Sequence, residues 1–169
     1  GRISNSSSRS NSGTFGLGYF GTKAYIGSSF GADIRRYGIP FAALFEAPKK
    51  PEGEFPIVDD EIDVRARRYN FRINGGLRDL TNPFLRAVQY NLDYTTYRHK
   101  EIETADDVDE VGTIFDNKTF SYRSLFEQTK QGRLTGRFGF EGFNREYEVN
   151  GAEQLIEGKI NHDSVSVLA

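Results

Sequence analysis

The chain has 169 residues, a formal net charge of −2, and no cysteine, methionine or tryptophan. Its balanced charge shows no electrostatic footprint for nucleic acid, and the lack of cysteine excludes disulfides, thiolate metal sites and cysteine nucleophiles from this chain. Apolar residues are only 37% of the chain although 14% of residues are aromatic, and no apolar run approaches the roughly 18 residues of a transmembrane helix. Membrane-spanning strands are not excluded by this, because alternating strands keep a low mean hydropathy.

Both ends of the chain have the character of interior sequence. Residues 1–13 are rich in serine and asparagine, and we expect a surface loop or the frayed end of a strand there. They contain no charged segment followed by an apolar one, so no signal peptide is predicted. Because residues 164–169 begin another alternating strand, we expect the chain to be a segment of a longer protein.

A hairpin is predicted over residues 13–41, where the period of two residues indicates extended chain with two unlike faces. Its turn is expected at Gly21-Thr22, since glycine in the first central position suits a two-residue type II′ turn. This turn predicts Tyr19 opposite Ala24 and collects the apolar side chains of both strands on one face. A slip of one residue would mix the two faces.

Two further hairpins and part of a seventh strand follow. Residues 62–77 and 85–103 alternate around a short connection, with Phe71 expected opposite Leu92 and Ile73 opposite Tyr90. Residues 113–129 and 134–140 alternate around a tight turn at 128–133. Long polar connections are expected at the other end of the strands, at 36–61, 103–117 and 147–162, the first of which carries four of the five prolines.

Tight turns at one end of the strands and long loops at the other are the arrangement of an outer-membrane β-barrel. The predicted strands have about 14 to 19 residues, whereas about 5 or 6 are usual in globular proteins and about 9 to 11 span a bilayer. The fold class is therefore predicted to be all-β, an antiparallel up-and-down meander of about seven long strands. We interpret residues 1–169 as one partial barrel domain, an arc of a larger transmembrane β-barrel.

The alternation predicts one face against lipid and one toward a lumen. The residues expected to face lipid are Phe15, Leu17, Tyr19, Ile26, Phe30, Phe71, Ile73, Tyr90, Leu92, Phe120, Tyr122, Phe126, Phe138 and Phe140. The residues expected to line the lumen, mainly as salt-bridge ladders, are Arg68, Arg72, Asp93, Arg123, Glu127, Arg137 and Glu141. The same periodicity also fits the core of a soluble β-sandwich.

The strand series carries a family resemblance. The segment YFGTKAYIGSSFGADIRRYGIPF resembles a barrel hairpin of TonB-dependent outer-membrane receptors, and IDVRARRYNFRINGGLRDL is similar to the strand and short periplasmic turn that follow it. The segments YNLDYTTYRHKEIE and VGTIFDNKTFSYR are similar to later strands of that family. Neither a plug domain nor a TonB box can be placed in this sequence.

The resemblance implies TonB-energised uptake of a scarce ligand (a siderophore, metal complex, cobalamin or glycan) across the outer membrane of a Gram-negative bacterium. The partners it implies are outer-membrane lipid, the remainder of the barrel with its plug, TonB acting through that plug, and the small-molecule ligand, with no nucleic acid. Candidate ligand contacts near the loop bases are Arg65, Tyr97, His99 and Arg145.

No catalytic constellation, metal site or cofactor site is predicted. The two histidines, His99 and His162, are far apart in sequence, and the acidic stretch 103–110 lacks the glycine spacing of a calcium loop. We therefore expect a protein that is not an enzyme. Two alternatives to the receptor stay open, a passive porin-like barrel and a soluble extracellular all-β binding or adhesion module.

Overall fold

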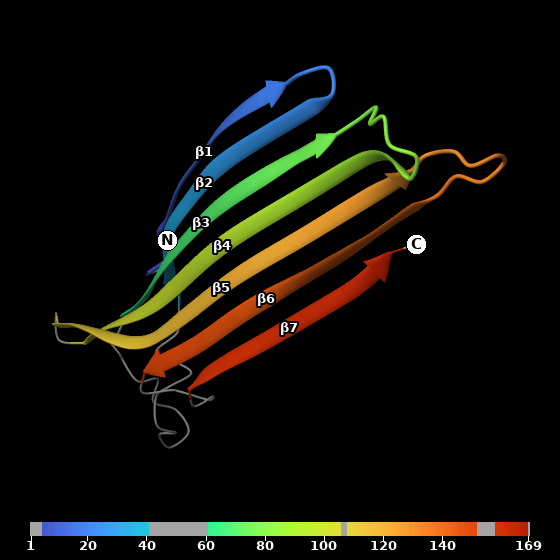
Figure 1. Cartoon of the computed structure of the whole chain (residues 1–169). Helices are drawn as coiled ribbons and strands as arrows, with labels where there is room; N and C mark the ends of the chain where they lie inside the picture. The colour runs from blue at the N-terminus through green and yellow to red at the C-terminus, as the bar shows by residue number, and fades with distance from the viewer. Residues whose placement is uncertain (1–4, 41–60, 106–107, 152–157, 169) are drawn as a thin grey trace.

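The computed structural model describes residues 5–40, 61–105, 108–151 and 158–168. These residues form seven strands in a single sheet (Figure 1). The strands are β1 (Ser8–Phe20), β2 (Ala24–Ile39), β3 (Glu61–Leu77), β4 (Leu85–Ala105), β5 (Val108–Gln128), β6 (Arg137–Gly151) and β7 (Lys159–Leu168). Among the described residues, no helix is long and apolar enough to cross a membrane.

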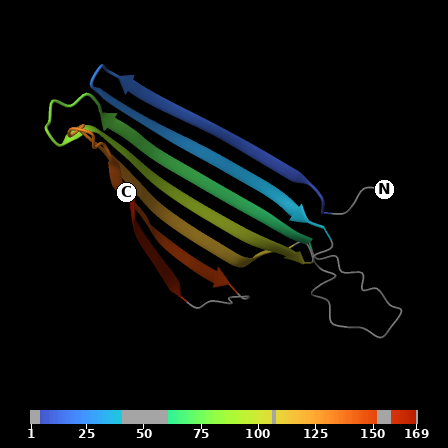
Figure 2. The ribbon, with the colours of Figure 1, turned by 90° about the vertical axis from the view of Figure 1, so that its right-hand side faces the viewer.

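Each strand pairs antiparallel with the next strand along the chain, in the order β1-β2-β3-β4-β5-β6-β7. This confirms the predicted all-β fold, an up-and-down antiparallel meander of about seven long strands. Figure 2 shows the described strands as one curved layer, with β1 and β7 at its two edges. The sheet is unclosed, because β1 and β7 do not pair with each other.

Several strand ends differ from the prediction. β1 begins at Ser8, within the segment that we expected to be a loop or a frayed end. β4 continues to Ala105 and β5 begins at Val108, so most of the loop expected at 103–117 is strand. β6 and β7 likewise extend into the loop expected at 147–162, and β2 ends at Ile39 inside the one expected at 36–61. Residues 41–60, 106–107 and 152–157 of these loops lie outside the described residues.

The first turn is centred one residue later than predicted. Tyr19 pairs with Ile26 rather than with Ala24, so the predicted register is wrong by two residues. The Gly21 N–H donates to the Ala24 carbonyl at 2.8 Å and closes a turn whose centre is 22–23. The type II′ turn at Gly21-Thr22 is therefore not formed.

The register between β3 and β4 differs from the prediction by the same amount. Ile73 lies opposite Leu92 and Phe71 lies opposite Tyr94, whereas we expected Tyr90 opposite Ile73. A shift of two residues returns every side chain to its own face, because successive side chains of a strand point to opposite faces. Both errors therefore left the predicted partition of the side chains intact.

The observed registers divide the sheet into two faces. One cross-strand row contains Phe15, Phe30, Phe71, Tyr94 and Phe120. The next row in the same parity contains Leu17, Ser28, Ile73, Leu92 and Tyr122. By this parity, all the residues predicted to face lipid share one face, which we call the apolar face. The opposite side, which carries all the predicted lumen residues, is the polar face.

Tyrosine rings lie over glycines of the neighbouring strand on the apolar face. Tyr90 pairs with Gly75, and a Cβ added at Gly75 would lie 2.5 Å from the Tyr90 Oη and 2.9 Å from the Tyr25 carbonyl oxygen. Tyr122 covers Gly142 in the same way. A glycine lets the ring approach the backbone and fill the space of the missing side chain, an arrangement known to pin strand register.

We predict that Gly75→Ala destabilises the protein by about 1–3 kcal/mol, the usual range for overpacking a close contact. Gly13→Ala is the matched control, because a Cβ at this strand glycine of β1 meets no atom within 4 Å. Urea unfolding followed by circular dichroism measures both variants. Equal midpoints for the two variants would contradict the packing of Tyr90 on Gly75.

Candidate functional site

The polar face contains a hollow of about 500 Å³. Strands β2, β3, β4, β5 and β6 all contribute to it. Its lining residues are Asp33, Arg35, Tyr37, Ala66, Arg68, Asp93, Thr95, Tyr97, Asn117, Thr119, Ser121 and Arg145. Hydroxyl, amide, guanidinium and carboxylate groups therefore surround one space, which can bind a polar solute or a polar protein surface.

Asp93, which lines this hollow, is the centre of a hydrogen-bond network on the polar face. Its carboxylate accepts from Asn70 Nδ2 at 2.9 and 3.0 Å, from Thr95 Oγ1 at 3.0 Å and from Arg72 Nε at 3.0 Å. Asn70 Nδ2 also lies 2.9 Å from Thr95 Oγ1. Because these groups come from two neighbouring strands, the network fixes the side chains of β3 and β4 on the polar face.

Other ion pairs of the polar face are also partly exposed. Arg35 binds Asp33 through Nε at 2.8 Å and through a second nitrogen at 2.6 Å. Arg123 lies 3.5 Å from Glu141 across β5 and β6, and Arg137 lies 3.7 Å from Glu127. These contacts agree with the predicted salt-bridge ladders. Exposed pairs of this kind contribute at most about 1 kcal/mol each, so they solvate the face more than they stabilise it.

Three of the four predicted ligand contacts lie on the polar face. Tyr97 and Arg145 line the hollow. The Tyr97 hydroxyl lies 3.3 Å from His99 Nδ1, and the His99 ring packs edge-on against Phe115. Arg65 does not join them, because it lies opposite Arg36 on the apolar side of the sheet. The structure therefore brings three of the four candidates to one face and leaves Arg65 on the other.

Sequence reasoning missed several residues of the hollow. Arg35 and Tyr37 of β2, and Asn117 and Thr119 of β5, line it beside Tyr97. The alternation of each strand places these residues on the polar face, and this was the only sequence signal that could have identified them. Parity alone gives every second residue of a strand, however, and only the register decides which of them lie side by side.

The apolar face ends along a boundary that runs obliquely across the sheet. The last apolar or aromatic residues before the first charged residue, counted from the turn end, are Ile34 in β2, Tyr69 in β3, Tyr94 in β4 and Phe120 in β5. The row that contains Phe120 reaches β2 at Phe30, four residues before Ile34. The boundary therefore moves toward the turns from β2 to β5.

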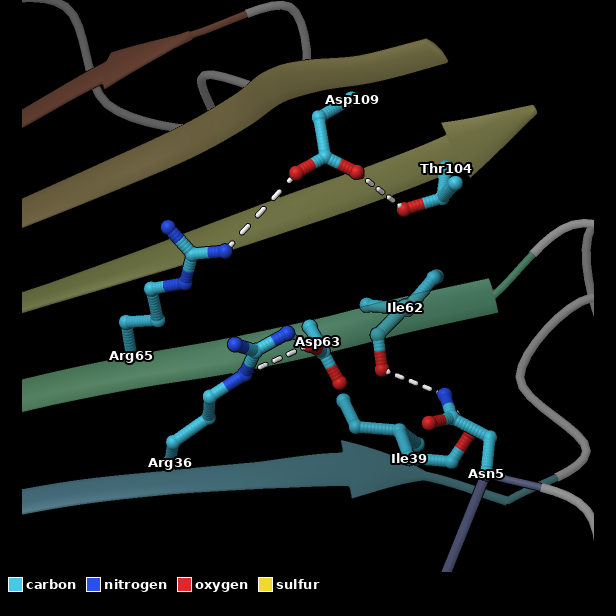
Figure 3. Close-up of polar contacts among 8 residues, drawn as sticks. All are labelled: Asn5, Arg36, Ile39, Ile62, Asp63, Arg65, Thr104 and Asp109. Carbon is cyan, nitrogen blue, oxygen red and sulfur yellow. Dashed lines mark hydrogen bonds and ion pairs between the residues drawn. The ribbon is translucent and has the colours of Figure 1, made fainter. Parts of the chain in front are cut away.

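Charged residues begin directly beyond this boundary. Arg98 binds Asp116 at 2.7 and 2.8 Å, and Arg36 binds Asp63 (Figure 3). Glu146 binds Lys159 at 2.5 Å and Lys118 at 3.4 Å, and these lysines lower the pKa of its carboxyl group. Glu146 therefore stays ionised to lower pH than a free glutamate.

No metal centre is found among the described residues, which contain no group of three or more histidine, cysteine or acidic side chains arranged to hold an ion. No family model matches this chain, and no curated protein matches it.

We predict that Asp93→Ala lowers the free energy of unfolding by about 1–3 kcal/mol, because Asn70 and Arg72 lose a half-buried charged acceptor. Glu141→Ala removes an exposed pair of the same face, and its effect should stay within about 0.5 kcal/mol. Equilibrium unfolding in urea compares the two variants. A smaller loss for Asp93→Ala than for Glu141→Ala would exclude the network as a stabilising element.

Proposed function

We propose that this chain is an arc of a transmembrane β-barrel in the outer membrane of a Gram-negative bacterium. Its apolar face contacts lipid, and its polar face lines the lumen. The first support is the exposure of large apolar side chains, which reaches 68% for Phe15 and Leu17, 49% for Phe30 and 45% for Phe71. A continuous apolar face of this kind requires a cover, because soluble monomers rarely expose apolar patches beyond a few hundred Å².

The oblique boundary is the observation that carries the proposal. Strands lie about 4.8 Å apart and rise about 3.4 Å per residue, so a flat lipid boundary crossing strands tilted by 35–45° shifts by about 1.0–1.4 residues per strand. Over the three steps from β2 to β5 this amounts to about 3 to 4 residues. The observed shift is four residues. A flat layer across tilted strands therefore accounts for where each strand turns from apolar to charged.

Strand length also supports a membrane span. β4 and β5 have 21 residues each, about twice the 9–11 residues that cross a bilayer. The hairpin of β4 and β5 extends beyond its neighbours at the end opposite the turns (Figure 1). Most of the long loop predicted at 103–117 is therefore a β-hairpin, which projects above the proposed lipid boundary.

We further propose that the barrel is a TonB-dependent receptor that takes up a scarce ligand such as a siderophore, metal complex, cobalamin or glycan. The resemblance of the strand series to that family motivates this part. The polar hollow provides a surface where a plug domain or a ligand would be held by hydrogen bonds and ion pairs. A passive porin-like barrel shares the lipid face and the lumen, and it differs in needing no energy.

The lipid face is tested with single cysteines, which this cysteine-free chain makes simple to introduce. We expect bimane attached at Phe71→Cys in the membrane-reconstituted intact protein to be quenched strongly by doxyl-labelled lipids. The matched control is Arg72→Cys, one residue away on the opposite face. Equal quenching at both positions, or none at Phe71, would contradict a lipid-facing apolar face and favour a soluble module.

Energy coupling is tested by uptake in the host bacterium. We predict that deleting the gene and collapsing the proton-motive force with an uncoupler abolish the same uptake of a radiolabelled substrate, screened over ferric siderophores, cobalamin and oligosaccharides. Uptake that depends on the gene and persists with the uncoupler would assign the chain to a passive barrel. Absence of gene-dependent uptake for every substrate would contradict the transport function.

A further inference from the structure

We propose that a cationic cluster beyond the apolar face binds the phosphate head group of a membrane lipid. This inference rests on the proposed lipid contact of the apolar face and adds a specific ligand site to it. The cluster, called the basic patch here, consists of Arg36, Arg65, Arg67, Arg98 and Lys100. All five side chains belong to β2, β3 and β4 and share the parity of the apolar face.

The basic patch places like charges directly opposite each other. Arg36 lies opposite Arg65, Arg65 lies opposite Lys100, and Arg67 lies opposite Arg98. Directly opposed residues have Cβ atoms about 4.5–5.5 Å apart, and like charges in such pairs destabilise a sheet. These opposed cations repel each other within the sheet. We infer that a bound anion offsets this repulsion.

The described carboxylates neutralise only part of the patch. Arg36 binds Asp63, Arg98 binds Asp116, and Arg65 lies 3.8 Å from Asp109 (Figure 3). Asp109 is 60% exposed and also accepts from Thr104 Oγ1 at 2.8 Å, so it is a loose partner. Arg65 Nε is buried and donates no hydrogen bond within the described part of the chain.

Two cations of the patch have no partner among the described residues. Arg67 and Lys100 form no hydrogen bond or ion pair there, and Arg67 is exposed. Arg98 keeps 55% of its side chain exposed although it binds Asp116. The free donors therefore converge on β3 and β4, where a guanidinium fork can bind a phosphate through two parallel hydrogen bonds.

The position of the patch selects a lipid over a soluble anion. Tyr69 and Phe71 lie two and four residues from Arg67 on the same face of β3, which corresponds to about 7 and 14 Å along the strand. They are 38% and 45% exposed. An amphiphile whose acyl chains pack on these rings therefore has its phosphate at the level of Arg67 and Arg98. A soluble phosphate would gain nothing from the adjoining aromatic surface.

The patch also has a fixed framework. Asn5 Nδ2 donates to the Ile62 carbonyl at 2.8 Å and lies 3.4 Å from the Ile39 carbonyl, so it ties the ends of β2 and β3 together (Figure 3). The Gly38 N–H donates to the Ser7 carbonyl at 3.0 Å. Because these bonds hold the strand ends beside the patch, the arginines project from ordered backbone.

The test measures lipid binding to the intact protein in detergent, by native mass spectrometry with phosphatidylglycerol and phosphatidylcholine. We expect phosphatidylglycerol to bind preferentially. Each cation removed should weaken its binding about fivefold, and Arg67→Gln with Lys100→Gln should weaken it at least about tenfold. Arg68→Gln is the matched control, since it removes the same charge one residue away on the polar face and should change binding by less than twofold.

Three outcomes would overturn the inference. The first is equal weakening by Arg67→Gln and Arg68→Gln, which would indicate net charge rather than a site. The second is equal binding of the two lipids. The third is full competition by millimolar inorganic phosphate, which would assign the patch to a soluble anion. Doxyl-lipid quenching of bimane at Phe71→Cys in reconstituted membranes separates this failure from failure of the lipid face. Quenching there without a lipid preference in detergent would leave the proposed barrel intact.

Discussion

The constraint on which the rest of the structure depends is that each strand pairs only with its neighbours along the chain. Antiparallel ladders join β1 through β7 in sequence order, and the described residues form no second layer. With all the backbone pairing confined to one curved sheet, neither face is covered by another element of the described chain. Every functional property then follows from how side chains divide between the two faces and from where that division changes along each strand.

The two faces use different chemistry to reach stability. On the polar face, Asp93 satisfies donors from β3 and β4, and charged residues pair across β5 and β6. On the apolar face, rings such as Tyr90 pack over backbone at Gly75 and stay partly exposed. A ring that covers a glycine buries backbone without needing a facing layer. The apolar side chains therefore need a cover that the described chain does not supply. The polar side chains, in contrast, form hydrogen bonds and ion pairs with each other.

The sequence was sufficient for strand parity and insufficient for register. Alternation around Tyr19 and Ile73 fixed which side chains share a face, and a two-residue shift leaves that partition unchanged. The contacts within the hollow depend on the shift itself. Arg72 meets Asp93 only in the observed register, since the predicted one placed Asn91 opposite Arg72. For the same reason, the grouping of Arg35, Tyr37 and Tyr97 was not predictable.

Strand ends were predicted worst where both faces are polar. Glu103 pairs with Glu110 and Thr104 pairs with Asp109, so β4 and β5 continue through a stretch with no apolar face. Alternation marks a strand only when one side is apolar, and a solvated strand then has the composition of a loop. The face on which Arg65 lies was unpredictable for the same reason. Its strand carries arginines on both faces near that end, so charge could not identify which face it occupies.

The free edges of the sheet support the proposed barrel in lipid. In the described chain, β1 and β7 each pair on one side only, and both are exposed along most of their length. Unpaired strand edges are templates for uncontrolled association, and closing a sheet into a barrel is the arrangement that removes them. A facing sheet, as in a soluble sandwich, would cover the apolar rows and leave both edges open. Closure of the sheet with further strands would pair both edges. Lipid around such a barrel would cover the apolar rows. Closure also explains why the charged border crosses the sheet obliquely, since closed barrels require tilted strands.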